Sequence, residues 1–570
     1  MMTWDLTIFF KNLDELDKFS KITEEKALKF NQTYNSNLNN LNPDDFLLAI
    51  KEYEDIAYNL NKIMSYAQLS FAKDTSKGAL LAKYEEICTK IEEKMLFFML
   101  EFNQISKEKQ DIFIEFCKPY SYYLELSLKN KPHQLSLAEE RILLRTSNTG
   151  ADAFSRLFDE SMAKLKFKFE DKELSEEEIL SKMFDKDREI RKKAALSLSD
   201  TLGKNQHLLT FIYNMIKTDL KNECELRNYE FPETPRHQSN QIDKLSVDSL
   251  IKVTEENFDL VSKFYNKKRE ILGYEKLYDY DRYAPLDDDA KFDFKEAKDI
   301  VLKAFTDFSP TFGNLAQKAF DENWCDIYPV QNKQSGAFSC SSSADTHPFV
   351  LLNYTDKRRD VFTLAHELGH AIHQYLSYQV GLLNSDTPLT TAETASVFCE
   401  MLVFEYIKNK TPQNKRMGLL AGKLEDIFST LYRQINFTTF ERKVHAYEGE
   451  ISSDELNRIW LEESKKMFGD SLVLNDYYKI WWSYIPHFIH SPFYCYAYGY
   501  AQLLVLALFG LYKSGKCEDF IRIYTEFLSL GGSKSPKDMV AMFGFDINKE
   551  EFWDIGMNEI KKLVDEFIVI

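Results

Sequence analysis

The sequence predicts a mainly α-helical protein that carries a small β-sheet beside one functional helix. Helix-breaking residues are sparse, with 14 prolines and 19 glycines in 570 residues. Apolar residues recur at helical spacing through most of the chain, whereas segments with strand character are few. With 44% hydrophobic residues, the chain can bury a large core.

Helical patterns dominate the N-terminal part of the chain. They run with few breakers from about residue 13 to 130 and again over 187–220. Ser175, followed by Glu178, predicts a capping box that opens a helix. Residues 228–240 include two prolines and several polar side chains, so we expect a loop there.

The chain shows no internal repeat and no low-complexity tract that would mark a domain boundary. We expect the main subdivision near residue 190. It separates an N-terminal helical region, residues 1–190, from a catalytic region, residues 191–570.

Two short segments with strand character precede the functional helix. Residues 336–340 and 349–354 are separated by a polar stretch and predict two strands of a small sheet. The unpaired edge of such a sheet can hold an extended peptide through backbone hydrogen bonds. A purely structural hairpin is the alternative.

The segment from His366 to His370 carries the strongest chemical signal, because it reads HELGH. On a helix, residues four apart project from one face about 6 Å apart along the axis, which suits two ligands of one zinc ion. Glu367 then lies beside the metal, where a carboxylate can take a proton from an activated water. An ordinary amphipathic helix can contain the same pattern by chance, but the proline-free apolar spacing over 361–380 favours a metal helix. Asp360 is expected as its N-cap or first-turn acid.

A catalytic zinc site needs a third protein ligand and an open fourth position. Glu393 follows His370 by 23 residues and opens a second helical stretch, which could return antiparallel to the metal. His373 shares the face of the two ligand histidines but lies too far along the helix, so we expect a packed or orienting role. A three-histidine site of the metzincin type would need glycine at 373 and histidine at 376, where this chain has His373 and Leu376.

Two further residues, Glu400 and Gly369, are candidates for structural roles around the motif. Glu400 lies two turns beyond Glu393, where it could orient a ligand histidine through the free ring N–H or lie at a solvated helix edge. Both readings stay open. Gly369 inside the metal helix costs ~1 kcal/mol relative to alanine, so we expect a neighbouring backbone to lie close against it.

Residues 477–500 form a second cluster, with two histidines and seven tyrosines. Phenol and imidazole groups can donate hydrogen bonds to the oxyanion that forms when a peptide is hydrolysed, and each such donor contributes roughly 10²- to 10³-fold in rate. Tyr494 and Tyr498 are one helical turn apart and could face one cleft. Aromatic core packing is the alternative, and on sequence physics alone it is favoured for most of these tyrosines.

Composition narrows the class of protein. The net charge of −18 argues against a nucleic-acid partner, which would require clustered Lys and Arg. The eight cysteines are scattered without a CxxC pair, so neither a zinc knuckle nor a disulfide framework is expected. Residues 1–6 lack the features of a signal peptide, and the apolar stretch 503–511 is too short to span a bilayer. We therefore expect a reduced, cytoplasmic protein without a membrane partner.

The chain resembles peptidase family M3, and within it the oligoendopeptidase F branch. The resemblance lies in the order and spacing of these segments: Trp4-Asp5-Leu6, Tyr278-Asp279, Tyr283-Ala284-Pro285-Leu286, Gly336-Ala337-Phe338, His347-Pro348-Phe349, Thr363 to His373, Ala392 to Ser396, Phe440-Glu441, Ile485-Pro486-His487-Phe488 and Pro492 to Tyr498.

The resemblance implies an elongated helical zincin with a deep channel that admits short unstructured peptides and excludes folded proteins. It implies one zinc ion per chain and these roles: His366, His370 and Glu393 as ligands, Glu367 as base, and His487, Tyr494 and Tyr498 as oxyanion donors. The spacing departs slightly from distant family members, so Tyr500 or His490 could be donors instead. Ser491-Pro492-Phe493 stands where other branches have a glycine-rich loop.

The function expected from these features is zinc-dependent endopeptidase activity on short oligopeptides. One alternative is a peptidyl-dipeptidase, which would need a cation to hold the substrate's terminal carboxylate. Another is a non-catalytic peptide-binding protein with a structural zinc. The predicted base and the open coordination position argue against that alternative.

Overall fold

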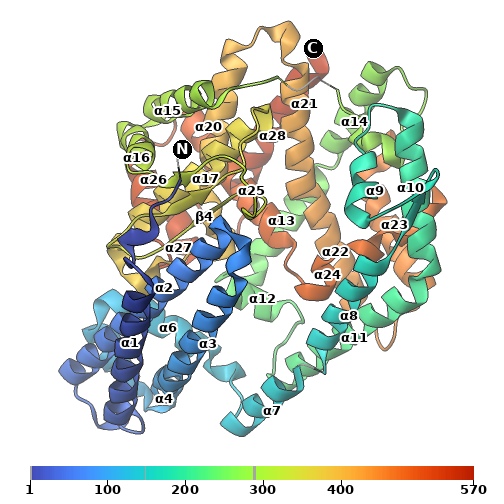
Figure 1. Ribbon diagram of the computed structural model, residues 1–570. Coiled ribbons are helices and arrows are strands. Elements are labelled where there is room, and N and C mark those ends of the chain that lie inside the picture. Colours follow the sequence, from blue (N-terminus) through green and yellow to red (C-terminus); the bar gives the residue numbers. More distant parts are fainter. Residues whose placement is uncertain (1–2, 148, 287–289) are drawn as a thin grey trace. The chain divides into compact units, whose positions relative to one another are not determined.

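The computed structural model describes residues 3–147, 149–286 and 290–570, and helices make up most of it (Figure 1). Met1 and Met2, the first residues of the segment in which no signal peptide is expected, lie outside the described part. The chain forms two units, each built from three separate segments. Unit 1 comprises Met1–Pro132, Asp289–Lys410 and Lys516–Gly544, and unit 2 comprises His133–Asp288, Thr411–Gly515 and Phe545–Ile570. The functional division expected near residue 190 stays a prediction.

Unit 1 joins a set of N-terminal helices to the helices that surround the predicted metal motif. Its aromatic core includes Phe46 and Phe113, whose rings stack with centroids 4.1 Å apart. The helices are α1 Leu13–Tyr34, α2 Pro43–Lys73, α3 Gly78–Met95, α4 Phe97–Gln104, α5 Lys107–Phe116, α6 Ser121–Asn130, α15 Phe294–Phe308, α16 Pro310–Asp321, α17 Arg358–Ser377, α18 Leu382–Ser385, α19 Leu389–Ala392, α20 Thr394–Lys410, α26 Phe520–Ser529 and α27 Pro536–Ala541.

A three-stranded sheet in unit 1 confirms the small sheet expected beside the metal helix. Its strands are β3 Cys325–Asp326, β4 Phe338–Cys340 and β5 Phe349–Leu351, in the order β3-β5-β4. Strand β5 pairs parallel with β3 and antiparallel with β4, so β4 is an edge strand. The sequence predicts β4 and β5 but not β3, because a strand of two residues is too short to show a period.

Unit 2 is also helical and has its own core, in which Trp481 and Phe488 are buried. Its elements are α7 Leu137–Ser147, α8 Ala151–Lys164, β1 Phe167–Phe169, β2 Lys172–Leu174, α9 Glu176–Lys182, α10 Arg188–Lys204, α11 Gln206–Leu226, α12 Thr234–Ser239, α13 Lys244–Glu256, α14 Asp259–Leu272, η6 Asp279–Tyr283, α21 Met417–Ile427, η9 Phe428–Tyr432, α22 Arg433–Ala446, α23 Ser453–Phe468, η11 Asp476–Tyr484, α24 His487–His490, α25 Tyr496–Ser514 and α28 Glu550–Val569.

Two of the local structures predicted from the sequence, a capping box and a loop, fall in unit 2. The capping box is confirmed, because Ser175 accepts from the Glu178 N–H and Glu178 accepts from the Ser175 N–H. The prediction of a loop at 228–240 is wrong for the second half of this segment, which forms α12. Pro235 lies in the first turn of that helix, where its missing N–H leaves no bond unmade, so it starts a helix instead of interrupting one.

The apolar stretch 503–511 lies within α25, where all of its residues are buried. None of the helices in the described part of the chain combines the length and the hydrophobicity that crossing a bilayer requires. All eight cysteines are free thiols.

Candidate metal centre

Helix α17 presents the HELGH motif, and its start follows the sequence prediction. The carboxylate of Asp360 lies in the first turn and accepts hydrogen bonds from the backbone N–H groups of Thr355 and Lys357. The helix ends at Ser377, and a 3₁₀ turn continues to Val380. The region predicted at 361–380 is therefore helical throughout.

Glu393 lies at a break between two helices. Helix α19 ends at Ala392 and α20 begins at Thr394, while Glu393 itself has φ −81° and ψ 2°. Two contacts from a distant part of unit 1 hold this region. The Tyr524 hydroxyl donates to the Thr394 carbonyl at 2.8 Å, and the Gly532 N–H donates to the Asn384 carbonyl at 2.7 Å.

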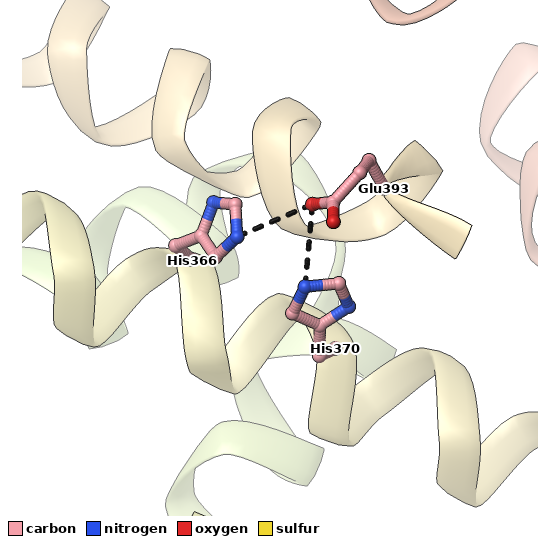
Figure 2. A group of neighbouring side chains, drawn as sticks. All are labelled: His366, His370 and Glu393. Atoms are coloured by element: carbon pink, nitrogen blue, oxygen red, sulfur yellow. Dashed lines mark ion pairs between the residues drawn. The ribbon is translucent and has the colours of Figure 1, made fainter. Parts of the chain in front are cut away.

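The two imidazoles of α17 and the carboxylate of Glu393 converge on one point (Figure 2). Oxygen Oε2 of Glu393 lies 3.2 Å from Nε2 of His366 and 3.3 Å from Nε2 of His370. Zinc bonds of about 2.0–2.1 Å at tetrahedral angles separate neighbouring ligand atoms by roughly 3.3 Å. The two nitrogen-to-oxygen distances therefore match those between ligand atoms of a zinc tetrahedron, and two imidazoles with one carboxylate are a donor set that zinc accepts.

Gly369 explains how the two helices come this close, as the sequence predicts. A Cβ atom at Gly369 would lie 2.6 Å from Cα of Ser396 and 2.7 Å from the carbonyl oxygen of Ala395. Real Cβ atoms do not approach backbone atoms so closely, so only glycine allows α20 to lie against α17 here. This contact brings Glu393 to the histidine pair.

We therefore expect Gly369→Ala to push α17 and α20 apart. Overpacking of this kind destabilises by about 1–3 kcal/mol, so the melting temperature should fall. The zinc affinity should fall with it. The matched control is Gly422→Ala in α21, where an added Cβ meets nothing within 4 Å and the helix should gain up to ~1 kcal/mol. Thermal melting and zinc titration of both variants check this, and unchanged zinc affinity in Gly369→Ala would contradict it.

The acids around the histidines set the electrostatics of the site. Burial lowers the pKa of His366, but hydrogen bonds to Glu393 and Glu400 outweigh it and raise that pKa to about 10. Burial also raises the pKa of Glu393, while hydrogen bonds to the two histidines outweigh it and bring the pKa well below its ordinary value. Glu400 Oε2 lies 3.5 Å from Nδ1 of His366, the ring nitrogen that faces away from Glu393. This geometry favours an orienting role for Glu400 over a solvated one.

His373 occupies the packed position that its spacing predicts. Its side chain is buried, and burial lowers its pKa to about 4 despite a hydrogen bond to the Ala392 backbone. That bond connects α17 to the end of α19, directly before Glu393. His373 therefore supports the position of Glu393 and is not part of the group of side chains that converge there.

A cavity of about 410 Å³ opens beside these side chains within unit 1. Its lining includes His366, Glu367, His370 and Glu393, together with Phe338 and Ser339 of edge strand β4. Burial raises the pKa of Glu367, while the two histidines lower it. Glu367 therefore lines the same cavity as the expected metal ligands and the sheet edge.

The predicted donors lie in unit 2 and form a cluster of their own. Nε2 of His487 lies 3.3 Å from the hydroxyl of Tyr498, and the Tyr494 and Tyr498 rings lie 5.1 Å apart, edge to face. All three side chains are half-buried. The two alternative donors have other contacts. Tyr500 is buried with its hydroxyl 3.4 Å from Oγ of Ser246, and His490 lies 2.8 Å from a carboxylate oxygen of Asp159.

The loop before Tyr494 has a strained residue that sequence reasoning missed. Phe493 adopts φ +58°, a region that bulky residues rarely occupy. Its N–H donates to Oε1 of Glu441 at 2.8 Å, and this glutamate is fully buried on α22. Glu441 thus holds the segment Ser491-Pro492-Phe493 in place where other branches have glycines. A buried acid within a helix leaves no sequence pattern, which is why only the resemblance pointed to it.

We expect Glu441 to make the folded state sensitive to alkaline pH. Burial raises its pKa to about 8, although the Phe493 N–H and Arg236 favour the charged form, and Glu233 opposes it. The pKa of Glu441 is higher in the folded state than in the unfolded state. The free energy of unfolding is therefore highest below about pH 4.5 and falls as the pH rises toward 8, by up to about 1.4 kcal/mol per pH unit.

The matched variant is Glu441→Gln, which keeps an acceptor for the Phe493 N–H but cannot ionise. Its melting temperature should match that of the wild type near pH 4 and exceed it increasingly up to about pH 8, above which the difference should level off. A difference in melting temperature between variant and wild type that stays constant over this range would show that Glu441 is not the group responsible.

The chain is similar to known proteins over its full length. A model described as Peptidase family M3 matches residues 182–559, and one described as Oligopeptidase F matches residues 101–167. An oligoendopeptidase F homolog from Borreliella burgdorferi is 30% identical over 99% of this chain and 97% of its own length. A crystal structure from Chlamydophila abortus matches with TM-score 0.91 at 25% identity, covering 100% of this chain and 98% of that one. Oligoendopeptidase-F from Enterococcus faecium matches with TM-score 0.71 at 22% identity, covering 97% and 99%.

Proposed function

Because this chain belongs to peptidase family M3, a family of metallopeptidases, we propose that it is a zinc-dependent oligopeptidase whose metal is held by His366, His370 and Glu393. One observation carries the proposal: a single carboxylate oxygen lies 3.2 and 3.3 Å from the two imidazole nitrogens. We further propose one zinc ion per chain, because one such group of side chains occurs among the described residues.

The chemistry divides between the ion and the chain. When bound, zinc acts as a Lewis acid that acidifies water and polarises a carbonyl. Three protein ligands leave the fourth position of a tetrahedron open, as a catalytic site requires. Glu400, at 3.5 Å from Nδ1 of His366, fixes the orientation of that ring.

Glu367 is proposed as the general base and acid. Its carboxylate takes a proton from the attacking water and later delivers it to the leaving amine. Its position in the lining of the cavity that contains the ligand atoms supports this role. Burial, which raises its pKa, makes the carboxylate a stronger base than an exposed glutamate.

His487, Tyr494 and Tyr498 are proposed as donors to the oxyanion. Their support is mutual proximity, partial exposure and the resemblance, whereas Tyr500 and His490 are engaged elsewhere. Preorganised donors of this kind contribute roughly 10²- to 10³-fold each. The deep channel that the resemblance implies stays a prediction.

Short unstructured peptides are the proposed substrates. Edge strand β4 lines the cavity through Phe338 and Ser339, so it can accept an extended peptide as an additional strand. Backbone pairing of this kind tolerates many side chains, which fits a broad oligopeptidase. The free thiols of the chain fit a reducing cytoplasm, where we propose that the protein acts.

The test is digestion of a peptide library by metal-stripped and zinc-loaded protein, read by mass spectrometry. We expect cuts at internal bonds of acetylated, amidated peptides, no cuts in folded proteins, and loss of all cleavage after chelation, restored by about one equivalent of zinc. Removal of dipeptides only from free C-termini would support a peptidyl-dipeptidase instead. Tight binding without cleavage by the zinc-loaded protein would support a non-catalytic binding protein.

A further inference from the structure

Unit 2 contains two buried or half-buried arginines that face tyrosines instead of acids. Arg282, at the end of η6, is 5% exposed, and Arg433 at the start of α22 is half-buried. Arg282 donates to the hydroxyls of Tyr283 and, at 3.3 Å, of Tyr478. Arg433 donates to the Tyr484 hydroxyl at 3.3 Å. These five residues are here called the arginine–tyrosine cluster.

The cluster has two positive charges without an acidic counterpart. Neither guanidinium forms an ion pair with an Asp or Glu in the part of the chain that the structure describes. Among the acids nearby, Asp281 pairs with Arg188 and Arg191, and Glu425 pairs with Lys268. Asp279 accepts a hydrogen bond from Asn475; burial raises its pKa, and the charge of Arg282 opposes this without forming an ion pair. The Nε groups of both cluster arginines are also buried without a hydrogen-bond partner. This excess of positive charge fits an anion from outside the chain, which would reach the cluster through the half-exposed Arg433 and not through the buried Nε groups.

Burying an unpaired cation is costly, and neutral phenols only partly offset that cost. An arginine fork is shaped to bind a carboxylate through two parallel hydrogen bonds. The half-buried state of Arg433 and Tyr283 leaves that side of the cluster reachable from solvent. Phe184, which packs on Tyr283 with centroids 4.8 Å apart and is 59% exposed, adds an apolar surface beside it.

The cluster adjoins the proposed oxyanion donors. The charge of Arg433 acts on His487, whose pKa is lowered first by burial and then by this guanidinium. His487 in turn lies 3.3 Å from Tyr498. Tyr484, which Arg433 contacts at 3.3 Å, lies three residues before His487 in the chain, so one extended peptide can contact both Arg433 and the proposed donors.

We propose that the arginine–tyrosine cluster binds a carboxylate of the peptide substrate, with Arg433 as the residue that contacts it. The carboxylate belongs either to the free C-terminus of the peptide or to an Asp or Glu side chain. The inference rests on the proposed peptidase function. It makes the enzyme selective for anionic peptides, although the chain as a whole is strongly acidic.

The test uses two pairs of quenched fluorescent peptides with blocked N-termini. The first pair differs only in a free carboxylate against a carboxamide at the C-terminus. The second pair is amidated and differs in Asp against Asn at one internal position. The wild type should favour the carboxylate member of one pair by about tenfold to a hundredfold in kcat/KM. The favoured pair tells which carboxylate is bound.

Arg433→Gln should bring that ratio close to one. The matched control is Arg458→Gln, which removes an exposed guanidinium of the same unit that pairs with Glu455, and it should keep the wild-type ratio. Tyr283→Phe is a second variant that keeps the ring and removes the hydroxyl, and it should lower the ratio partially. Zinc content and melting temperature confirm that each variant is folded.

The outcomes separate this inference from the proposed function. Equal rates for both members of both pairs in the wild type, or a preference that Arg433→Gln retains, would overturn the carboxylate subsite. If no peptide is cleaved, the proposed function fails, and the subsite is then read by binding alone. Fluorescence anisotropy then compares Glu367→Gln with Glu367→Gln/Arg433→Gln. The double variant should bind the favoured peptide at least tenfold more weakly than the single variant; equal affinities would refute the carboxylate subsite.

Discussion

Replacing Glu367 by glutamine is expected to reduce kcat/KM for peptide cleavage by about 10²- to 10⁴-fold while the metal stays bound. Glutamine has nearly the shape of glutamate but cannot accept the proton of the attacking water. Such a loss corresponds to about 2.7–5.5 kcal/mol of transition-state stabilisation. The ligand atoms belong to other side chains, so zinc stoichiometry should remain near one per chain.

Stability gives an independent readout for Glu367→Gln. Burial raises the pKa of Glu367, so removing its charge should leave the melting temperature equal to or above that of the wild type. The matched control is Glu405→Gln, an equivalent change in α20 at a residue that pairs with Lys408. It should keep full activity. Substantial turnover by Glu367→Gln would show that another group is the base.

Replacing Glu393 by alanine is expected to abolish both tight zinc binding and peptide cleavage. Removing this proposed ligand should weaken zinc binding by more than the 10- to 100-fold typical of losing an orienting partner. Zinc at about 1,000 times its Kd stabilises a folded protein by about 4 kcal/mol, so the wild type should melt at a higher temperature with zinc. Glu393→Ala should show almost no such shift.

Glu400→Gln serves as the graded comparison for Glu393→Ala. Its side chain contacts His366 at Nδ1 and does not contribute to the cluster of ligand atoms, so we expect an affinity loss of only about 10- to 100-fold. Activity should return at high zinc concentration. Equal zinc affinity in wild type and Glu393→Ala would remove Glu393 from the metal centre and contradict the proposed site.

The helices were the most predictable part of the molecule, because their signals are local. Once a helix is assumed, the four-residue spacing of His366 and His370 places both side chains on the same face, about one turn apart. Gly369 also gave a correct prediction, because an unfavourable residue inside a helix needs a packing reason. Here that reason is the backbone of Ala395 and Ser396.

Features that depend on contacts between distant segments could not be predicted in the same way. Strand β3 is too short for a pattern, and the break at Glu393 follows from packing against α17. The positive φ of Phe493 depends on Glu441, about fifty residues earlier in the chain. The cluster around Arg282 and Arg433 draws on residues from η6, α22 and η11, and no single stretch of sequence displays it.

The interrupted path of the chain through unit 1 has a consequence for biosynthesis. The region that bears Glu393 is held by Tyr524 and Gly532, which belong to the segment Lys516–Gly544. During translation, a nascent chain that has reached residue 515 has both histidines but lacks these two supports. The hydrogen bonds that hold the region of Glu393 can therefore form only after the segment Lys516–Gly544 has been synthesised, late in translation.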